Sequence, residues 1–509
     1  MQDFNLPFNR IKMKTKGTIS LQYKRIALSL LACFGLLTGG CKKLADVDTP
    51  INSTSTENVY KDNSTASAVF IGLYSRISAR FFNGGLASLS VYGELSADNL
   101  SIYDINTSRS FARYYRNDLE PTYADETSTT YWQTVYQLLY TVNDAIANLN
   151  GNAHLSPKVA SRLLGEAYFL RAFCYFYLVN LYGDVPLILT TDPEANAKAG
   201  RTSTTEVYAQ MNNDLSNAEA LLTQDYVPAD VTKTTNERLR PNLAAVHALQ
   251  ARVFLYQKNY SAAESAATKV IEQSDYFFTE LNNTFLKNSP ETIWALQSVT
   301  YGINTFANRY LLITDIGLDG SDNNFYLSES LLNNFEAGDQ RKTDWVRSIE
   351  TNGKIYYYPT KYRSPVIAGS TVFEEYDIVL RLSEQYLIRA EARNEQNNIA
   401  GAIADLNMLR DKRRGPQTPD VGNPLPAISL TVTQQQLRPL ILKERRSELY
   451  TEWGHRWFDL KRSGTIDAVM SVEVQKKDAT WSSYKGLFPI PTSEIFVNRA
   501  LTQNTGYIN

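Results

Sequence analysis

Helical periodicity is the feature that most constrains how this 509-residue chain can fold. Between Trp132 and Leu149, apolar residues recur at steps of three and four, which places them on one face of a helix. Ser156 and Pro157 then supply an N-cap and a first-turn proline for a helix that we expect to run to about Tyr182. This second segment is apolar on most sides, so we expect it to be a buried central helix.

Two later helix pairs share one register. Ala251 and Ala263 lie twelve residues apart, as do Ala390 and Ala402. Small residues at this spacing let two antiparallel helices approach closely, which is how tetratricopeptide repeats pack. The Trp and Pro positions of that repeat are missing, so we expect tetratricopeptide-like hairpins rather than a full repeat array.

Between about residues 274 and 377 the helical periodicity fades. Asn, Gly, Ser and Tyr become frequent, and short β-prone runs such as residues 292–296 appear. An irregular stretch of this length in a compact protein is usually functional. The expected fold is therefore mainly α, with tetratricopeptide-like helical hairpins supporting an irregular, loop-rich region with a few short strands.

Residues 1–40 predict a targeting signal. A basic segment that includes Lys24 and Arg25 precedes residues 26–40, a run of fifteen residues without a charge. Spanning a bilayer takes about 20 apolar residues, so the run is too short for a membrane helix and fits a signal peptide. It ends at Cys41, as a lipoprotein signal does, although Thr38 stands where that pattern usually has Leu. An ordinary secretory signal is the alternative, and either Met1 or Met13 could be the start.

Net charge argues against a nucleic-acid-binding protein, and the cysteine content argues against an internal disulfide. Cleavage before Cys41 leaves 45 basic and 52 acidic residues, so the formal net charge becomes −7 instead of −2. A nucleic-acid-binding protein normally has a basic surplus. With Cys41 lipidated, Cys174 has no partner, and we expect no internal disulfide.

Four motifs follow in order behind the leader. They are GEAYFLRA with LYGDVPL (residues 165–187), RLSE with YLIRAEA (381–392), ILKERRSEL with GHRWFDLKR (441–462), and LFPIP with LTQN and GY (487–507). In this order and spacing they resemble the SusD/RagB family, surface lipoproteins of nutrient-uptake systems in Bacteroidota.

The resemblance implies a lid of a SusC-type TonB-dependent transporter, anchored at the outer membrane by lipid on Cys41 and facing the cell surface. Such a protein captures an oligosaccharide without making or breaking a bond, and needs no cofactor, metal or nucleic-acid partner. The implied regions are a removed signal (1–40), an N-terminal helical region (41–273) and a C-terminal region (274–509) with a loop-rich ligand-binding insertion and closing helices.

Two other functions stay open at this point. A helical-repeat scaffold that binds proteins or peptides at the outer membrane needs the same hairpins but no sugar site. A surface hydrolase could use Glu444, Glu448 and His455 as acid and base. Glu444 and Glu448 are one helical turn apart beside Arg445, however, and this spacing predicts an ion network on a helix surface.

Metal and anion sites are not predicted. The three histidines lie far apart without metal-ligand spacing. The oxygen-rich residues 319–324 predict a turn, because the twelfth position of a calcium loop would fall on Ser330. The basic residues 410–414 precede Gly415, where cations at a helix C-terminus favour the helix dipole.

The chain is rich in tyrosine, with 32 Tyr against 21 Phe. Tyrosine combines an apolar face with a polar tip, which suits a wet binding surface. Several aromatic residues fall in two polar, aperiodic segments, where we expect them to stack on sugar rings, although local packing or contact with a transporter would also explain them. The candidate ligand residues are Tyr103, Tyr114, Tyr115, Tyr301, Tyr310, Phe325 and Tyr326.

Overall fold

The computed structural model of the chain describes residues 59–80, 88–121, 126–313, 317–320 and 324–508. The predicted signal at residues 1–40 and the predicted lipidation site Cys41 lie outside these ranges. Residues from Val59 onward form one compact unit, with elements from both sides of residue 273. The expected boundary at that residue stays a prediction.

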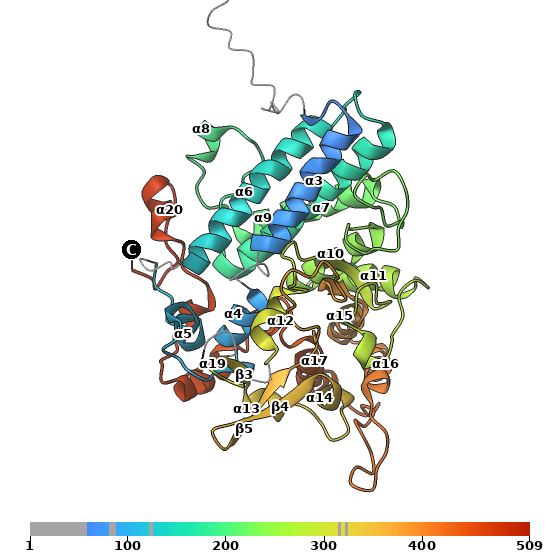
Figure 1. The fold of residues 1–509 in the computed structure, drawn as a ribbon, viewed down its shortest axis with the longest axis vertical. Helices are drawn as coiled ribbons and strands as arrows, with labels where there is room; N and C mark the ends of the chain where they lie inside the picture. Colours follow the sequence, from blue (N-terminus) through green and yellow to red (C-terminus); the bar gives the residue numbers. More distant parts are fainter. Residues whose placement is uncertain (1–58, 81–87, 122–125, 314–316, 321–323, 509) are drawn as a thin grey trace, which may run out of the picture. The chain divides into compact units, whose positions relative to one another are not determined.

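The fold is mainly helical, as expected (Figure 1). The helices are α3 (Asn63–Arg80), α4 (Leu89–Ser96), α5 (Arg109–Arg116), α6 (Glu126–Leu149), α7 (Pro157–Tyr182), α8 (Pro193–Asn196), α9 (Thr204–Leu221), α10 (Leu243–Tyr256), α11 (Tyr260–Ile271), α12 (Phe306–Leu311), α13 (Glu329–Leu332), α14 (Gln340–Asp344), α15 (Leu382–Glu395), α16 (Ile399–Arg413), α17 (Gln434–Leu449), α18 (His455–Arg462), α19 (Ile466–Glu473) and α20 (Thr492–Val497). The strands are β1 (Leu100–Ile102), β2 (Thr292–Leu296), β3 (Phe325–Leu327), β4 (Val346–Thr351), β5 (Lys354–Pro359) and β6 (Asp377–Arg381).

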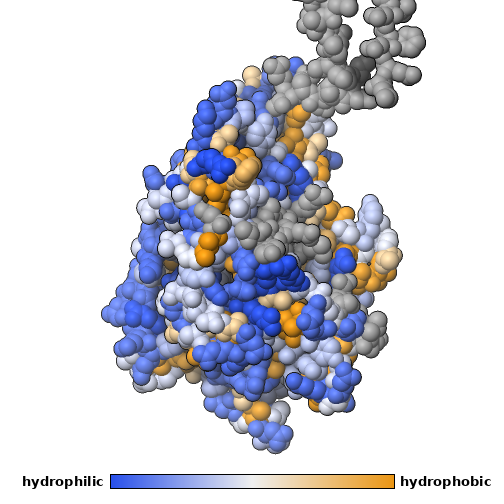
Figure 2. Space-filling view, turned by 90° about the vertical axis from the view of Figure 1, so that its left-hand side faces the viewer, coloured by the Kyte–Doolittle hydropathy of each residue, from blue (hydrophilic) through white to orange (hydrophobic). Residues whose placement is uncertain are grey.

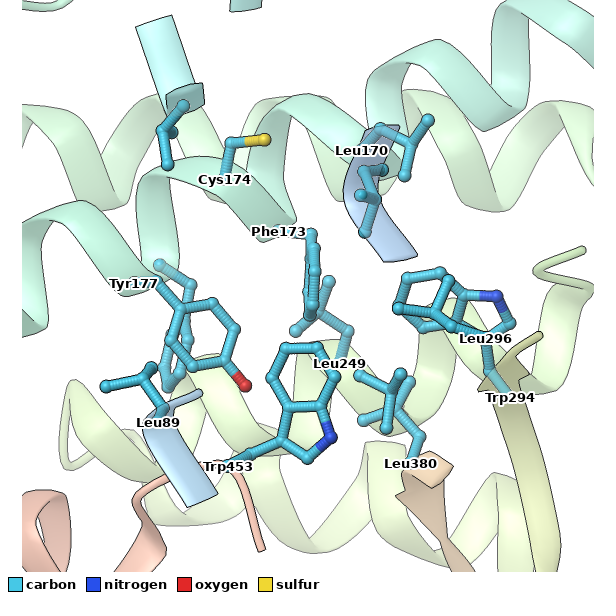
Figure 3. Close-up of a cluster of buried hydrophobic side chains, with 14 of the residues drawn as sticks. Leu89, Leu170, Phe173, Cys174, Tyr177, Leu249, Trp294, Leu296, Leu380 and Trp453 are labelled. Atoms are coloured by element: carbon cyan, nitrogen blue, oxygen red, sulfur yellow. The ribbon is translucent and has the colours of Figure 1, made fainter. Parts of the chain in front are cut away.

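Helix α7 is the buried central helix that the sequence predicts. It begins at Pro157 and ends at Tyr182, and it packs against α6 on one side and α9 on another. On a further side, the ring of Phe173 lies 5.0 Å from Trp294 of β2 and 5.8 Å from Trp453 (Figure 3). Burial of apolar surface is the main favourable contribution to folding, and large aromatic side chains bury the most. Because α7 packs against all of these elements, it forms the centre of the core.

The two predicted helical hairpins are confirmed as α10–α11 and α15–α16. Ala251 and Ala263 are fully buried in one hairpin, and Ala390 and Ala402 in the other. The hairpins stack through contact between α11 and α15. Small residues at these positions let the helix backbones approach closely.

Each hairpin turn uses the same capping chemistry. Lys258 and Asn397 have positive φ angles of 59° and 63°, and each precedes an asparagine that caps the second helix. The side chains of Asn259 and Asn398 accept hydrogen bonds from backbone N–H groups in the first turns of α11 and α16.

Three small antiparallel sheets make up the β structure of the described residues. They pair β1 with β3, β2 with β6, and β4 with β5. Asn352 and Gly353 both have positive φ, 53° and 74°, as a two-residue type I′ hairpin turn requires between β4 and β5. The β1–β3 pair joins the segment near Tyr103 to the loop-rich region, and β3 in turn contacts β5.

The charges of the third motif form a buried ion network, and the prediction of a surface network is wrong. Glu448 lies 2.7 Å from Arg381, 3.0 Å from Arg341 and 3.0 Å from Arg413, and all four side chains are almost inaccessible. Arg410 lies 2.7 Å from Glu444. Arg410 and Arg413 lie in the last turn of α16, as the sequence predicts for residues 410–414, and they also pair with carboxylates in the interior.

Helices α4 and α18 meet at a pair of glycines. A Cβ atom on Gly93 would lie 2.8 Å from the Cα of Gly454, and backbone cannot move away as a flexible side chain can. We expect Gly93→Ala to lower the free energy of unfolding by about 1–3 kcal/mol, measured by chemical denaturation. Gly72→Ala in α3 is the matched control, because a Cβ there meets nothing within 4 Å. Equal stability of the two variants would contradict the close approach.

Candidate functional site

The structure separates the seven aromatic residues that the sequence predicts as ligand contacts. Tyr114, Tyr310 and Phe325 are only 0%, 4% and 0% exposed, so a ligand cannot reach them and the prediction for these three is wrong. Tyr114 packs in the core, with its ring 4.4 Å from that of Tyr92. Tyr103, Tyr115, Tyr301 and Tyr326 remain accessible.

Regular structure explains this separation. Residues 109–116 form helix α5 rather than a loop, with Ser108 as its N-cap. Neighbouring residues on a helix point about 100° apart, so Tyr114 faces the core while Tyr115 faces outward. In strand β3, successive side chains alternate between faces, so Phe325 is buried and Tyr326 is not.

Tyr115 and Tyr326 line a cavity of about 470 Å³, which we call the tyrosine cleft. Its walls come from β1, α5, β3, α13, β5 and the segment around α19. Besides these two tyrosines, its polar and aromatic lining includes Tyr356 and Tyr357 of β5 with Lys354 and Lys477. Mixed aromatic and polar walls of this size suit a small ligand.

The aromatic rings form a row along β1, β3 and β5. The ring centroid of Tyr356 lies 4.9 Å from that of Tyr326 and 5.5 Å from that of Tyr103, both edge-on. Ser101 lines the same cleft as Tyr115 and Tyr326 and adds a hydroxyl group to its wall. The row therefore offers ring surfaces for apolar C–H groups and phenol oxygens for hydroxyls.

Two lysines flank the row. The ammonium of Lys354 lies 5.1 Å from the ring centroid of Tyr356, and that of Lys477 lies 4.8 Å from the ring centroid of Tyr115. Lys477 is buried, and its Nζ donates to the carbonyl oxygens of Leu95 at 2.7 Å and Ala97 at 2.6 Å. Burial lowers the pKa of Lys477 to about 7.

Tyr301 lies in a different cavity from Tyr115 and Tyr326. It is 67% exposed and lines a cavity of about 530 Å³ with Ile71, Val299 and Phe373. The walls of this second cavity are mostly apolar. The two aromatic segments that the sequence singled out therefore do not converge on one site.

The acid and base candidates of the third motif are not placed for catalysis. Glu444 and Glu448 are held in the buried ion network, and neither they nor His455 line the tyrosine cleft or the second cavity. Burial, together with nearby cations such as Arg252, holds the pKa of His455 well below its usual range. A general acid or base has to reach its substrate, which these buried groups do not.

Among the residues that the structure describes, no cluster of three or more His, Cys, Asp or Glu side chains could hold a metal ion. The oxygen-rich turn at residues 319–324 falls partly outside the described ranges.

The only described cysteine, Cys174, is a buried free thiol. No helix in these ranges has the length and hydropathy to span a bilayer.

Tyr356, Lys354 and Lys477 line the cleft but are not among the residues predicted from the sequence. A signal for the first two was present, because Asn352-Gly353 between β-prone runs is a strong mark of a hairpin. That hairpin places Lys354 and Tyr356 on one face of β5, since alternate residues share a face. Lys477 had no such signal, because it reaches the cleft from near the end of the chain.

The surface on the α5 and α20 side of the molecule is mainly hydrophilic, with separate hydrophobic patches, as Figure 2 shows. A broad apolar face, which would mark docking to a membrane or a large protein partner, is not visible in this view. The fold and the cleft together define a mainly helical protein whose hairpins support a loop-rich region with a ligand-sized, tyrosine-lined cavity.

Comparison with known protein families identifies this class. Residues 255–507 match the model described as the SusD family, and residues 47–255 match a model described as "Starch-binding associating with outer membrane". The chain therefore belongs to the SusD/RagB family, as its four motifs predict.

Individual relatives agree with this assignment. A SusD-like protein of Formosa agariphila is 26% identical, with 94% of this chain and 98% of the relative covered. The starch-binding protein SusD of Bacteroides thetaiotaomicron is 26% identical over 68% of this chain and 73% of its own. A crystal structure of a SusD superfamily protein from Bacteroides vulgatus superposes with a TM-score of 0.72 at 19% identity, with 88% of this chain and 100% of that chain covered. This likeness shows that the folds agree.

Proposed function

We propose that this protein captures an oligosaccharide at the cell surface and acts as the lid of a SusC-type TonB-dependent transporter, without cleaving its ligand. The observation that carries the proposal is the tyrosine cleft, where Tyr115, Tyr326 and Tyr356 offer ring faces beside polar groups. Sugars present axial C–H faces between hydroxyl groups, and this cleft matches both with aromatic and polar atoms.

Relatives in the family support a carbohydrate as the ligand. They include a starch-binding protein, a laminarin-binding SusD-like protein and a surface glycan-binding protein of Bacteroides uniformis. The last two are 22% and 20% identical to this chain. At this level of identity the two structures show that the fold is shared. That this chain also binds a glycan is part of the proposal.

Binding without hydrolysis is tested by incubating the purified protein with a panel of soluble glycans. We expect at least one glycan to retard the protein in affinity electrophoresis, and we expect no new reducing ends after prolonged incubation. Buried Glu444, Glu448 and His455 give no reason to expect hydrolysis. Accumulation of reducing ends would show an enzyme, and retardation by none of the glycans would contradict the glycan-binding function.

The lid role is tested at the membrane. We expect the protein, tagged at its C-terminus and extracted in mild detergent, to co-purify with a large β-barrel, and to lose its membrane association when Cys41 is replaced by Ser. The family model's description, which names the outer membrane, supports this location. Recovery of the protein alone in repeated gentle extractions would contradict the lid role while leaving glycan binding intact.

A further inference from the structure

The two lysines of the tyrosine cleft are available to a ligand in different ways. Lys354 is exposed at the first position of β5, and no carboxylate of the described residues pairs with it. Lys477 is 6% exposed and lines the cleft, its Nζ donates to two carbonyl oxygens, and its ammonium lies 4.8 Å from the ring centroid of Tyr115. One lysine is thus open to solvent and the other is fixed in the wall.

The carboxylates of the cleft are largely neutralised by other cations. Asp98 lies 2.6 Å from Arg456 and 2.9 Å from Arg446, and Glu473 lies 2.8 Å from Lys476. Among the described residues, Glu329 is the one carboxylate of the lining without an ion pair. The lining thus contains three lysines and three carboxylates. In the described part of the chain, Lys354 and Lys477 have no carboxylate within ion-pair distance, and both stand beside rings on which a sugar would stack.

We propose that the ligand of the tyrosine cleft is an acidic oligosaccharide, whose carboxylate or sulfate groups bind Lys354 and Lys477 while a sugar ring stacks on Tyr326 or Tyr356. This inference rests on the proposed glycan-binding function and names the chemical class of the glycan. A charge-assisted hydrogen bond to an anion is stronger than one to a neutral hydroxyl. An acidic sugar thus uses both the aromatic row and the flanking ammonium groups.

Proton uptake accompanies binding under this inference. The pKa of Lys477 lies at about 7 because burial disfavours the ammonium, while Asp98 and Glu473 act in the opposite direction. The cleft wall also carries Lys476 and Glu329, and Asp98 is itself paired with Arg446 and Arg456. The ammonium of Lys477 also lies near the Tyr115 ring and donates to two carbonyl oxygens. An anionic ligand favours the charged form, so affinity rises as the pH falls from above to below this pKa.

The experiment measures binding by isothermal titration calorimetry with matched acidic and neutral glycans. The acidic probes are oligogalacturonate, alginate oligomers and chondroitin sulfate, and the neutral probes are laminarin and malto-oligosaccharides. We expect an acidic probe to bind tightest, with affinity that falls as salt concentration increases. We expect Lys354→Gln to weaken that binding by about tenfold or more. Preference for a sulfated or for a carboxylated probe supports the inference either way and names the anion.

Lys476→Gln is the control variant, because Lys476 lines the same cleft but is already paired with Glu473. We expect it to change affinity by less than about threefold. Lys477→Met is a second variant, and it should abolish the pH dependence of binding between pH 6 and pH 8.5. Its thermal unfolding is measured first, because Lys477 also bonds to the backbone.

The outcomes separate this inference from the function on which it rests. Tightest binding of a neutral glycan, lost in Tyr356→Ala but unchanged in Lys354→Gln, would overturn the acidic ligand and keep the glycan-binding function. Absence of binding to every probe would overturn both the acidic ligand and the glycan-binding function.

Discussion

Replacing Glu448 by alanine should lower the free energy of unfolding by about 3–5 kcal/mol. Glu448 is the centre of the buried ion network, where its two carboxylate oxygens meet Arg341, Arg381 and Arg413. Those arginines come from α14, β6 and α16, so one carboxylate of α17 joins three other elements. Its loss leaves buried guanidinium groups with less compensating charge, and this causes the penalty.

Denaturant unfolding followed by circular dichroism measures this loss. The control is Glu395→Ala, which breaks an ion pair with Arg438 at the surface. Pairs of that kind contribute about 0–1 kcal/mol. Equal losses in the two variants would contradict the central role of Glu448, as would a Glu448→Ala protein as stable as the wild type.

The same network fixes the direction of a pH effect. Burial alone would raise the pKa of Glu448, but the guanidinium groups of Arg413, Arg381 and Arg341 hold it well below its usual range. A carboxyl group with a depressed folded-state pKa contributes stability above its unfolded pKa of about 4.3. This contribution is lost as the pH falls toward the folded-state value, so Glu448→Ala should weaken the acid dependence of unfolding.

Tyr356→Ala should reduce affinity for the captured glycan by about 30-fold or more. Tyr356 is at the centre of the aromatic row, with Tyr326 and Tyr103 on either side. An aromatic anchor in the middle of a binding site carries a large share of the binding free energy. Calorimetry with the best glycan of the panel gives the measurement.

The second cavity supplies the matched control for this variant. Tyr301→Ala removes an exposed aromatic residue outside the tyrosine cleft and should leave affinity within about twofold. Loss of binding in Tyr301→Ala but not in Tyr356→Ala would move the binding site to the second cavity. A scaffold that binds only peptides would show no glycan binding in any of the three proteins.

The long helices were predictable because their sequence signals are local. Pro157 and the apolar run after it gave both ends of α7, and the alanine spacing gave the two hairpins. The buried ion network was not predictable in the same way. Glu448 lies on a helix whose charges suggest a solvated face, and only tertiary structure brings Arg341, Arg381 and Arg413 against it.

The site was predictable only in part, because some of its elements are short and some of its residues are far apart in the sequence. Helix α5 has eight residues and β3 has three, which is too short to display a period, so Tyr114 and Phe325 were not distinguished from Tyr115 and Tyr326. The cleft also takes Lys477 from near the end of the chain, where no local pattern marks it. Aromatic composition indicated the type of site, and pairing of distant strands decided which residues form it.

The most direct test of the glycan-binding account is a crystal structure of the protein with the tightest-binding oligosaccharide of the panel. We expect sugar density in the tyrosine cleft, with a ring on Tyr326 or Tyr356 and an anionic group near Lys354. Sugar bound only beside Tyr301 in the second cavity, with the tyrosine cleft unoccupied, would contradict the account.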